Sequence, residues 1–232
     1  MKVMSFNTQH CKNYITKQID FKVMADAILK CGADIVGLNE MRSLGADVAE
    51  YDRQVEILSE LTGIDNYFFA QAINFPKGPY GNAFLSKLKI KKAESVIIPD
   101  PDPRGYDGYY ETRCVLKAEL EGGITVLVTH FGLNPDEQKN AVDTVLALIP
   151  DEKCILMGDF NVLPDNEVLA PIRARMRDTA ELFDCEKFSF PSDNPDRKID
   201  YIFVTPDIEV VSADIPAIVA SDHRPHTAEI RI

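Results

Sequence analysis

The stretch KIDYIFV, Lys198 to Val204, has the composition of a buried strand and carries a carboxylate, Asp200, near its start. Burying a carboxylate costs several kcal/mol unless a partner offsets the loss of hydration. Further along, SDHRPH (221–226) places Asp222 and His223 side by side. A carboxylate that pairs with an imidazole fixes the tautomer and raises the pKa of the ring, which suits an acid or base near neutral pH. We therefore expect Asp200 and His223 to meet in the folded chain.

The 232-residue chain has the proportions of a globular protein, with 45% hydrophobic and 27% charged residues. Composition shows no break, so we expect one domain over residues 1–232. The formal net charge of −12 disfavours long polyanions and anionic membranes as partners unless basic residues cluster or a divalent metal intervenes. Two basic clusters, 87–92 and 173–177, are each as readily explained as solvated surface.

The five cysteines are odd in number, widely spaced and mostly flanked by apolar residues. This pattern favours reduced core thiols over a disulfide framework or a zinc site. The opening MKVMSF lacks a charged region followed by an apolar run, and no apolar stretch is long enough to span a membrane. We therefore expect a cytoplasmic protein with no membrane insertion.

Hydrophobic periodicity predicts helices between residues 15 and 31 and between residues 48 and 61, and short strands follow through the middle of the chain. A third helix is signalled after His130, with Asn134 as N-cap, Pro135 in the first turn and Glu137 completing a capping box. Mixing βα units with consecutive strands predicts an α+β sandwich of sheets covered by helices.

Polar side chains recur where these strands end or begin, and loops at the ends of strands collect on one rim of layered sheets. Each has an ordinary alternative taken alone: a turn, a surface ion pair, a helix cap or a core histidine. Together they suggest a single cluster made of Asn7, Glu40, His130, Asp159, Asn161, Asp200, Asp222 and His223.

This set is rich in carboxylate and amide oxygen and poor in sulfur and nitrogen. Mg²⁺ and Mn²⁺ prefer such ligands, whereas zinc would want more histidine or cysteine. A metal held by carboxylates beside acid or base histidines is suited to phosphoester hydrolysis, because the metal offsets developing charge while a carboxylate readies water. We expect Mg²⁺ or Mn²⁺ as the cofactor.

Six motifs strengthen this interpretation: FNTQH (6–10), GLNE (37–40), THFGLN (129–134), MGDFN (157–161), KIDYIF (198–203) and SDHRPH (221–226). Each is short, but in this order they resemble the endonuclease/exonuclease/phosphatase superfamily, over about residues 2–231. The resemblance implies a four-layered α/β/β/α sandwich with two central, mainly antiparallel sheets and an active site at one end of them.

The resemblance also implies roles for the residues. Glu40 would be the principal metal ligand, with Asn7 and Asp222 close to the metal. Asp159 would orient or deprotonate the attacking water. The phosphate would be bound or stabilised by Asn161, by His130, and by His223 held by Asp200.

Substrate identity stays open, because a shared fold does not fix it. We expect a divalent-metal-dependent phosphoesterase that hydrolyses a phosphomonoester or phosphodiester of a phosphorylated small molecule or nucleotide-like substrate. A nuclease acting on DNA or RNA is the alternative, and a non-catalytic binding module is a third. The segment PDPRGYDGYYETR (101–113) is either an ordinary loop or a recognition loop in which Arg104 meets an anionic group and a tyrosine stacks on a ring. The resemblance implies that Arg113, at the end of this segment, faces the site, because many members of the superfamily carry an arginine or other polar residue there.

Overall fold

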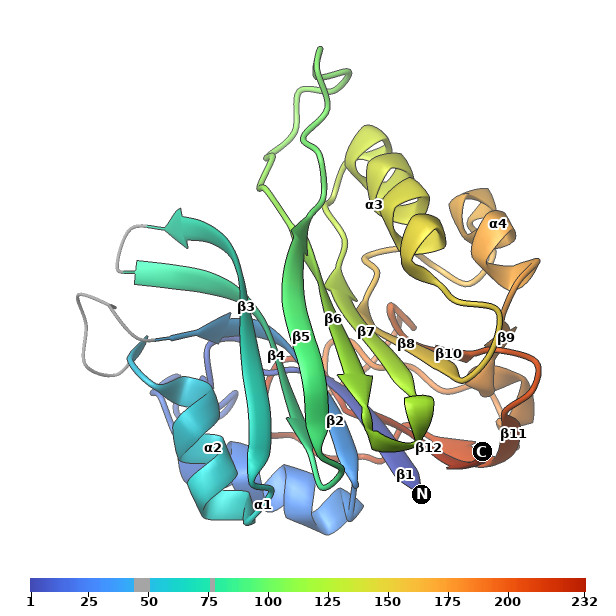
Figure 1. Cartoon of the computed structure of the whole chain (residues 1–232). Helices are drawn as coiled ribbons and strands as arrows, with labels where there is room; N and C mark the ends of the chain where they lie inside the picture. The colour runs from blue at the N-terminus through green and yellow to red at the C-terminus, as the bar shows by residue number, and fades with distance from the viewer. Residues whose placement is uncertain (44–50, 76–77) are drawn as a thin grey trace.

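The computed structural model describes residues 1–43, 51–75 and 78–232, and within these ranges the strands form two six-stranded sheets (Figure 1). The first sheet has the strand order β11 (Glu209–Asp214), β12 (His226–Arg231), β1 (Lys2–Asn7), β2 (Ile35–Arg42), β4 (Gly78–Ser86) and β3 (Asn66–Phe75). The second has the order β5 (Ile90–Ile97), β6 (Cys114–Leu120), β7 (Thr125–His130), β8 (Cys154–Asp159), β10 (Asp200–Val204) and β9 (Arg177–Asp178).

Each sheet contains one parallel pair, β1 with β2 and β7 with β8, and its remaining pairs in the described part of the chain are antiparallel. Parallel neighbours need a crossover, and helices α1 (Phe21–Cys31) and α3 (Pro135–Leu148) supply the two crossovers. The carboxyl ends of β1 and β2, and of β7 and β8, therefore lie at matching ends of their sheets. This arrangement gathers the predicted polar residues.

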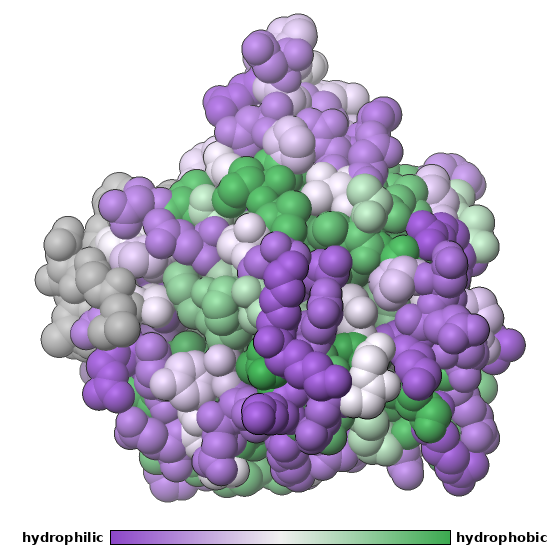
Figure 2. Space-filling view, viewed as in Figure 1, coloured by the Kyte–Doolittle hydropathy of each residue, from purple (hydrophilic) through white to green (hydrophobic). Residues whose placement is uncertain are grey.

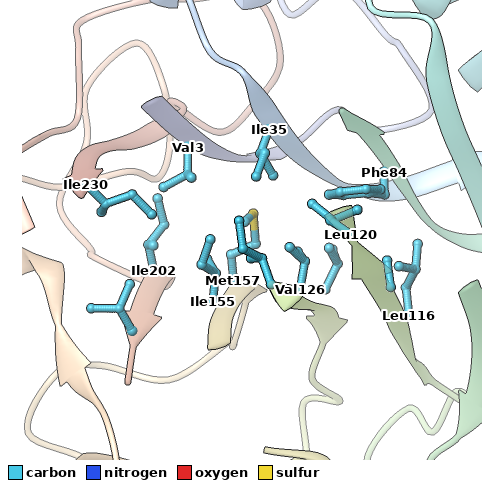
Figure 3. Close-up of a cluster of buried hydrophobic side chains, with 14 of the residues drawn as sticks. Val3, Ile35, Phe84, Leu116, Leu120, Val126, Ile155, Met157, Ile202 and Ile230 are labelled. Atoms are coloured by element: carbon cyan, nitrogen blue, oxygen red, sulfur yellow. The ribbon is translucent and has the colours of Figure 1, made fainter. Parts of the chain in front are cut away.

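Three buried hydrophobic clusters define the layers. The central cluster lies between the sheets and includes Val3, Ile35, Phe84, Met157 and Ile202 (Figure 3). A second packs the first sheet against α1 and α2 (Gln54–Thr62), and a third packs the second sheet against α3 and α4 (Ala170–Arg173). The predicted four-layered sandwich with mainly antiparallel sheets is confirmed.

Two glycines allow close backbone approach near the site. At Gly37, a side chain would meet the Met157 sulfur of the opposite sheet at 2.6 Å, so glycine lets the sheets approach at this point. Gly158 has a φ of 148° and lies against the Thr129 carbonyl of the neighbouring strand, where an added Cβ would clash with backbone. Gly158 precedes Asp159, and its conformation therefore helps to set where that carboxylate projects.

The first predicted helix is shorter than its periodicity suggested. Asp20 caps α1 by accepting a hydrogen bond from the Val23 amide at 3.1 Å, so the helix begins at Phe21. Ile15 is exposed, in a turn where its amide donates to the Asn13 side chain. The hydrogen bond from the backbone to the Asn13 side chain stabilises a turn here in place of a helix.

Two further expectations need correction. Leu61 of α2 is exposed rather than inward, because the helix presents Val55 and Leu58 to the sheet. Val48, which we assigned to the same helix, lies outside the described residues. All five cysteines are free, but Cys185 is exposed on the surface while the others are buried.

The third helix matches its sequence signals. Asn134 precedes α3, and Glu137 accepts a hydrogen bond from the Asn134 amide at 3.1 Å. The segment 99–113 projects beyond the sheets between β5 and β6 (Figure 1), and its surface is largely hydrophilic (Figure 2). None of the helices described is long and apolar enough to cross a membrane.

Candidate active site

Asp159, the last residue of β8, lies at the centre of the polar cluster. Its Oδ2 accepts a hydrogen bond from Asn7 Nδ2 at 3.1 Å and lies 3.5 Å from His130 Nε2 and 3.6 Å from His223 Nε2. Its backbone amide donates to the Asn39 side chain at 3.0 Å. Burial, and next the charge of a neighbouring carboxylate, raise the pKa of Asp159 to about 7, although His223 opposes the shift. A carboxylate with a raised pKa is a stronger base toward water.

Asp200 and His223 form the pair expected from the sequence. Asp200 opens β10 and is fully buried, and its Oδ2 lies 2.8 Å from His223 Nδ1. Burial alone would lower the pKa of His223, but the charges of Asp200 and Asp159 outweigh it and raise the pKa to about 10. The imidazole is therefore cationic at neutral pH, and its Nε2 faces Asp159.

Glu40 lies in a bulge of β2. The register between β2 and β4 shifts between Leu38 and Met41, and Glu40 has a φ of 58°. A bulge bends the strand and redirects a side chain, here toward Asn7, whose Nδ2 donates to Glu40 Oε1 at 3.1 Å. Burial raises the pKa of Glu40, and the charge of Asp222 adds to this shift. The two carboxylates are thus close enough for the charge of one to affect the other.

His130, at the end of β7, has a definite tautomer. Arg113 can only donate, and its Nη1 lies 2.8 Å from His130 Nδ1, so Nδ1 accepts and the ring proton lies on Nε2. Burial, and next the positive charge of Arg113, lower the pKa of His130 well below its usual value. The ring is therefore neutral and directs an N–H into the site.

Asn161 brings a second donor to the same place. Its Nδ2 donates to the Phe131 carbonyl at 3.0 Å, which fixes the orientation of the amide, and lies 3.1 Å from His130 Nε2. Both nitrogens carry hydrogen, so neither satisfies the other. Two N–H groups that converge in this way form a site for an anionic oxygen.

The donor set fits a hard divalent cation. Glu40 and Asp222 supply carboxylates whose mutual repulsion a cation would relieve. The oxygen of Asn7 accepts from the Gln9 amide at 3.1 Å, so Asn7 orients Glu40 and Asp159 through its NH₂ group. Ligand atoms of Asp159, Asp200 and His223 also lie within 4.8 Å of one another, but a metal there would have to break a buried ion pair. Glu40 and Asp222 could hold a cation without breaking that ion pair.

The two arginines proposed for substrate binding differ in placement. Arg113 lines a cavity of about 230 Å³ together with His10, Glu40, Arg42, Tyr80 and Glu111. Arg104 does not line that cavity: it is exposed, and its guanidinium lies 4.7 Å from the centre of the Tyr110 ring. Tyr110 in turn donates to Asp136 on α3 at 2.8 Å. The segment around Arg104 is therefore tied to α3.

Sequence reasoning missed several residues of the site. Asn39 and Asn82 are buried neighbours in the first sheet, where Asn39 Nδ2 donates to Asn82 Oδ1 at 2.8 Å. Each also donates to a carbonyl of the second sheet, Asn39 to Thr129 at 2.8 Å and Asn82 to Cys114 at 2.9 Å. His10 lies beside Glu40, and the Tyr80 hydroxyl accepts a hydrogen bond from Arg113 at 3.1 Å. The asparagines sit within GLNE and GNAF, where polar residues inside apolar strands were the available signal.

The chain belongs to the endonuclease/exonuclease/phosphatase family, because the sequence profile of that family matches residues 4–223. Members of this superfamily hydrolyse phosphoester bonds. None of the curated protein sequences compared with this chain matches it.

Solved structures share the fold at low sequence identity. An endonuclease/exonuclease/phosphatase from Beutenbergia cavernae is 22% identical with a TM-score of 0.78, covering 100% of this chain and 71% of that chain. A mannosyl-6-phosphatase from Bacteroides thetaiotaomicron is 18% identical with a TM-score of 0.78, covering 100% of both chains. A humanized TDP2 from D. rerio is 14% identical with a TM-score of 0.70, covering 100% of this chain and 99% of that chain.

Proposed function

We propose that this chain is a divalent-metal-dependent phosphoesterase that hydrolyses a phosphomonoester or phosphodiester of a small or modest-sized substrate. The observation that carries the proposal is the pair of convergent donors, His130 Nε2–H and Asn161 Nδ2–H, 3.1 Å apart beside the buried Asp159. A phosphate oxygen placed beside both donors would accept a hydrogen bond from each. Its phosphorus would then lie next to a carboxylate able to activate water.

Each side chain has one role in this proposal. Asp159 accepts a proton from the attacking water, since its raised pKa makes it a competent base. His223, kept cationic by Asp200, stabilises negative charge that develops on the phosphoryl oxygens. A divalent cation held by Glu40 and Asp222 would supply further charge neutralisation and orient the phosphate.

Cavity size and charge favour a modest substrate. Besides the 230 Å³ cavity at Arg113, a cavity of about 790 Å³ opens on the other side of Glu40 and is lined by Lys12, Lys17 and Tyr51 among others. These volumes suit a phosphorylated small molecule. The two lysines are the feature that favours the second candidate, a nuclease, because they could contact a second phosphate of a polynucleotide.

The test is hydrolysis of a panel of substrates by the wild-type protein in Mg²⁺, in Mn²⁺ and in chelator. The panel contains chromogenic phosphate monoesters and diesters, a sugar phosphate and single-stranded and double-stranded DNA, with Asp159→Asn as the inactive comparison. Metal-dependent release from a monoester or small diester supports the proposal, and cleavage of DNA alone supports the nuclease. Failure of every substrate with both metals would favour a binding module.

A further inference from the structure

His10 is held beside Glu40 by an unusual backbone conformation. Gln9, His10 and Cys11 have consecutive positive φ angles of 47°, 60° and 60°. The His10 amide donates to the Glu40 carbonyl at 3.0 Å, and Gln54 Nε2 donates to the His10 carbonyl at 2.9 Å. Left-handed conformations are unfavourable for residues other than glycine and cluster at functional sites. Here they direct the imidazole of His10 toward the Glu40 carboxylate.

The separation of the two side chains fits ligands that share one cation. His10 Nε2 lies 3.8 Å from Glu40 Oε2, which is too long for a hydrogen bond. Two ligands at about 2.1 Å from one metal ion are about 3.0 Å apart when adjacent and about 4.2 Å apart when opposite. The observed separation lies between these limits, so little movement would be needed to bind a cation between the two atoms.

The other ring nitrogen supports the same assignment. His10 Nδ1 is buried without a hydrogen-bond partner, and the ring packs against Tyr51 and Tyr80 with centroids 5.7 and 5.5 Å away. Within the described residues, Nε2 makes no hydrogen bond either. His10 and Glu40 also stand together between the two cavities, because both residues line both. Nε2 is therefore the nitrogen presented where a ligand can reach it.

We propose that His10 supplies, through Nε2, an imidazole ligand to the divalent cation held by Glu40. This inference rests on the proposed function and adds a nitrogen to a site otherwise made of oxygen. Mg²⁺ prefers oxygen ligands, whereas imidazole suits Mn²⁺ and the later divalent transition metals better. The consequence is a site that discriminates in favour of Mn²⁺ over Mg²⁺ through this one residue.

The experiment measures metal binding to the substrate-free protein, not activity. Mn²⁺ binding is titrated by electron paramagnetic resonance and Mg²⁺ binding by calorimetry, for wild type, His10→Asn and Glu40→Gln. Asparagine tolerates positive φ better than most residues other than glycine and so keeps the turn at this position. We expect His10→Asn to weaken Mn²⁺ binding ~10-fold or more and Mg²⁺ binding less than ~3-fold. We expect Glu40→Gln to weaken both.

A spectroscopic readout tests the bond itself and does not depend on comparing affinities. Pulsed electron paramagnetic resonance of the Mn²⁺-loaded wild type should show coupling to an imidazole nitrogen, absent in His10→Asn and kept in the control variant His130→Gln. Unchanged Mn²⁺ affinity in a folded His10→Asn, or coupling that survives it, overturns the assignment while leaving the proposed function intact. A wild type that binds neither cation overturns both.

Discussion

Replacing Asn39 with alanine should destabilise the fold far more than its single amide suggests. Asn39 is fully buried, and its Nδ2 donates to Asn82 Oδ1 and to the Thr129 carbonyl, each at 2.8 Å, while its Oδ1 accepts from the Asp159 amide at 3.0 Å. Each buried hydrogen bond contributes about 1 kcal/mol net, and a buried partner left unpaired costs about 1–3 kcal/mol. The substitution leaves three buried partners unpaired, so even at the lower end of that range we expect a loss of about 3 kcal/mol or more in the free energy of unfolding.

The assay is urea-induced unfolding of wild type and Asn39→Ala at one pH, with the m-value checked to be the same. Asn66→Ala is the matched control, because Asn66 makes one side-chain hydrogen bond, to the Ser86 carbonyl at 3.1 Å, and is half-buried. The control should lose less than about 1 kcal/mol. A loss for Asn39→Ala as small as that of the control would refute the view that this residue ties the sheets together beneath the site.

Three further perturbations probe the site. Asp200→Asn should keep the fold but lower turnover by about 100-fold or more, because the neutral amide no longer holds His223 cationic; steady-state kinetics with unchanged circular dichroism would show this. Burial lowers the pKa of Lys198 to about 8 from 10.5, so between these pH values the unfolded chain binds a proton that the folded chain does not. Unfolding free energy should therefore rise with pH over that window in wild type relative to Lys198→Met, and a constant difference would contradict the assignment. Arg113→Lys should lower kcat, because lysine cannot donate to His130 in the geometry of the guanidinium group, and an unchanged kcat would contradict this role.

The sequence predicted best those features that depend on residues close together in the chain or on a residue type that needs a partner. The capping residues before α3 predicted that helix, and the mixture of βα units with consecutive strands predicted a layered α+β sandwich, to which the family resemblance added the count of four layers. A buried carboxylate at the start of a strand indicated that Asp200 needs a partner, and in the structure that partner is His223. These inferences depend on local chemistry or on the cost of an unpaired charge, and both can be read from residue types.

Other features depend on tertiary placement and could not be read in this way. The turn at Asn13 replaces the first helical turn, and positive φ angles at His10 and Glu40 carry no reliable sequence signature. Asn39 looked like a polar residue inside a strand until Thr129 of the opposite sheet supplied its acceptor. The site residues that were missed are therefore those whose partners come from the other sheet or from a bulge.

The most direct test of the central claim is phosphoester hydrolysis by wild type and by His223→Ala. The two proteins are purified separately by the same procedure and assayed in Mg²⁺, in Mn²⁺ and in chelator. Arg231→Gln serves as the control, since Arg231 is exposed and pairs with Glu209 far from the site. We predict hydrolysis that requires a divalent metal, that falls by orders of magnitude in His223→Ala and that is unchanged in the control. Hydrolysis that proceeds equally in His223→Ala, or equally in chelator, would contradict the assignment of this cluster as a metal-dependent phosphoesterase site.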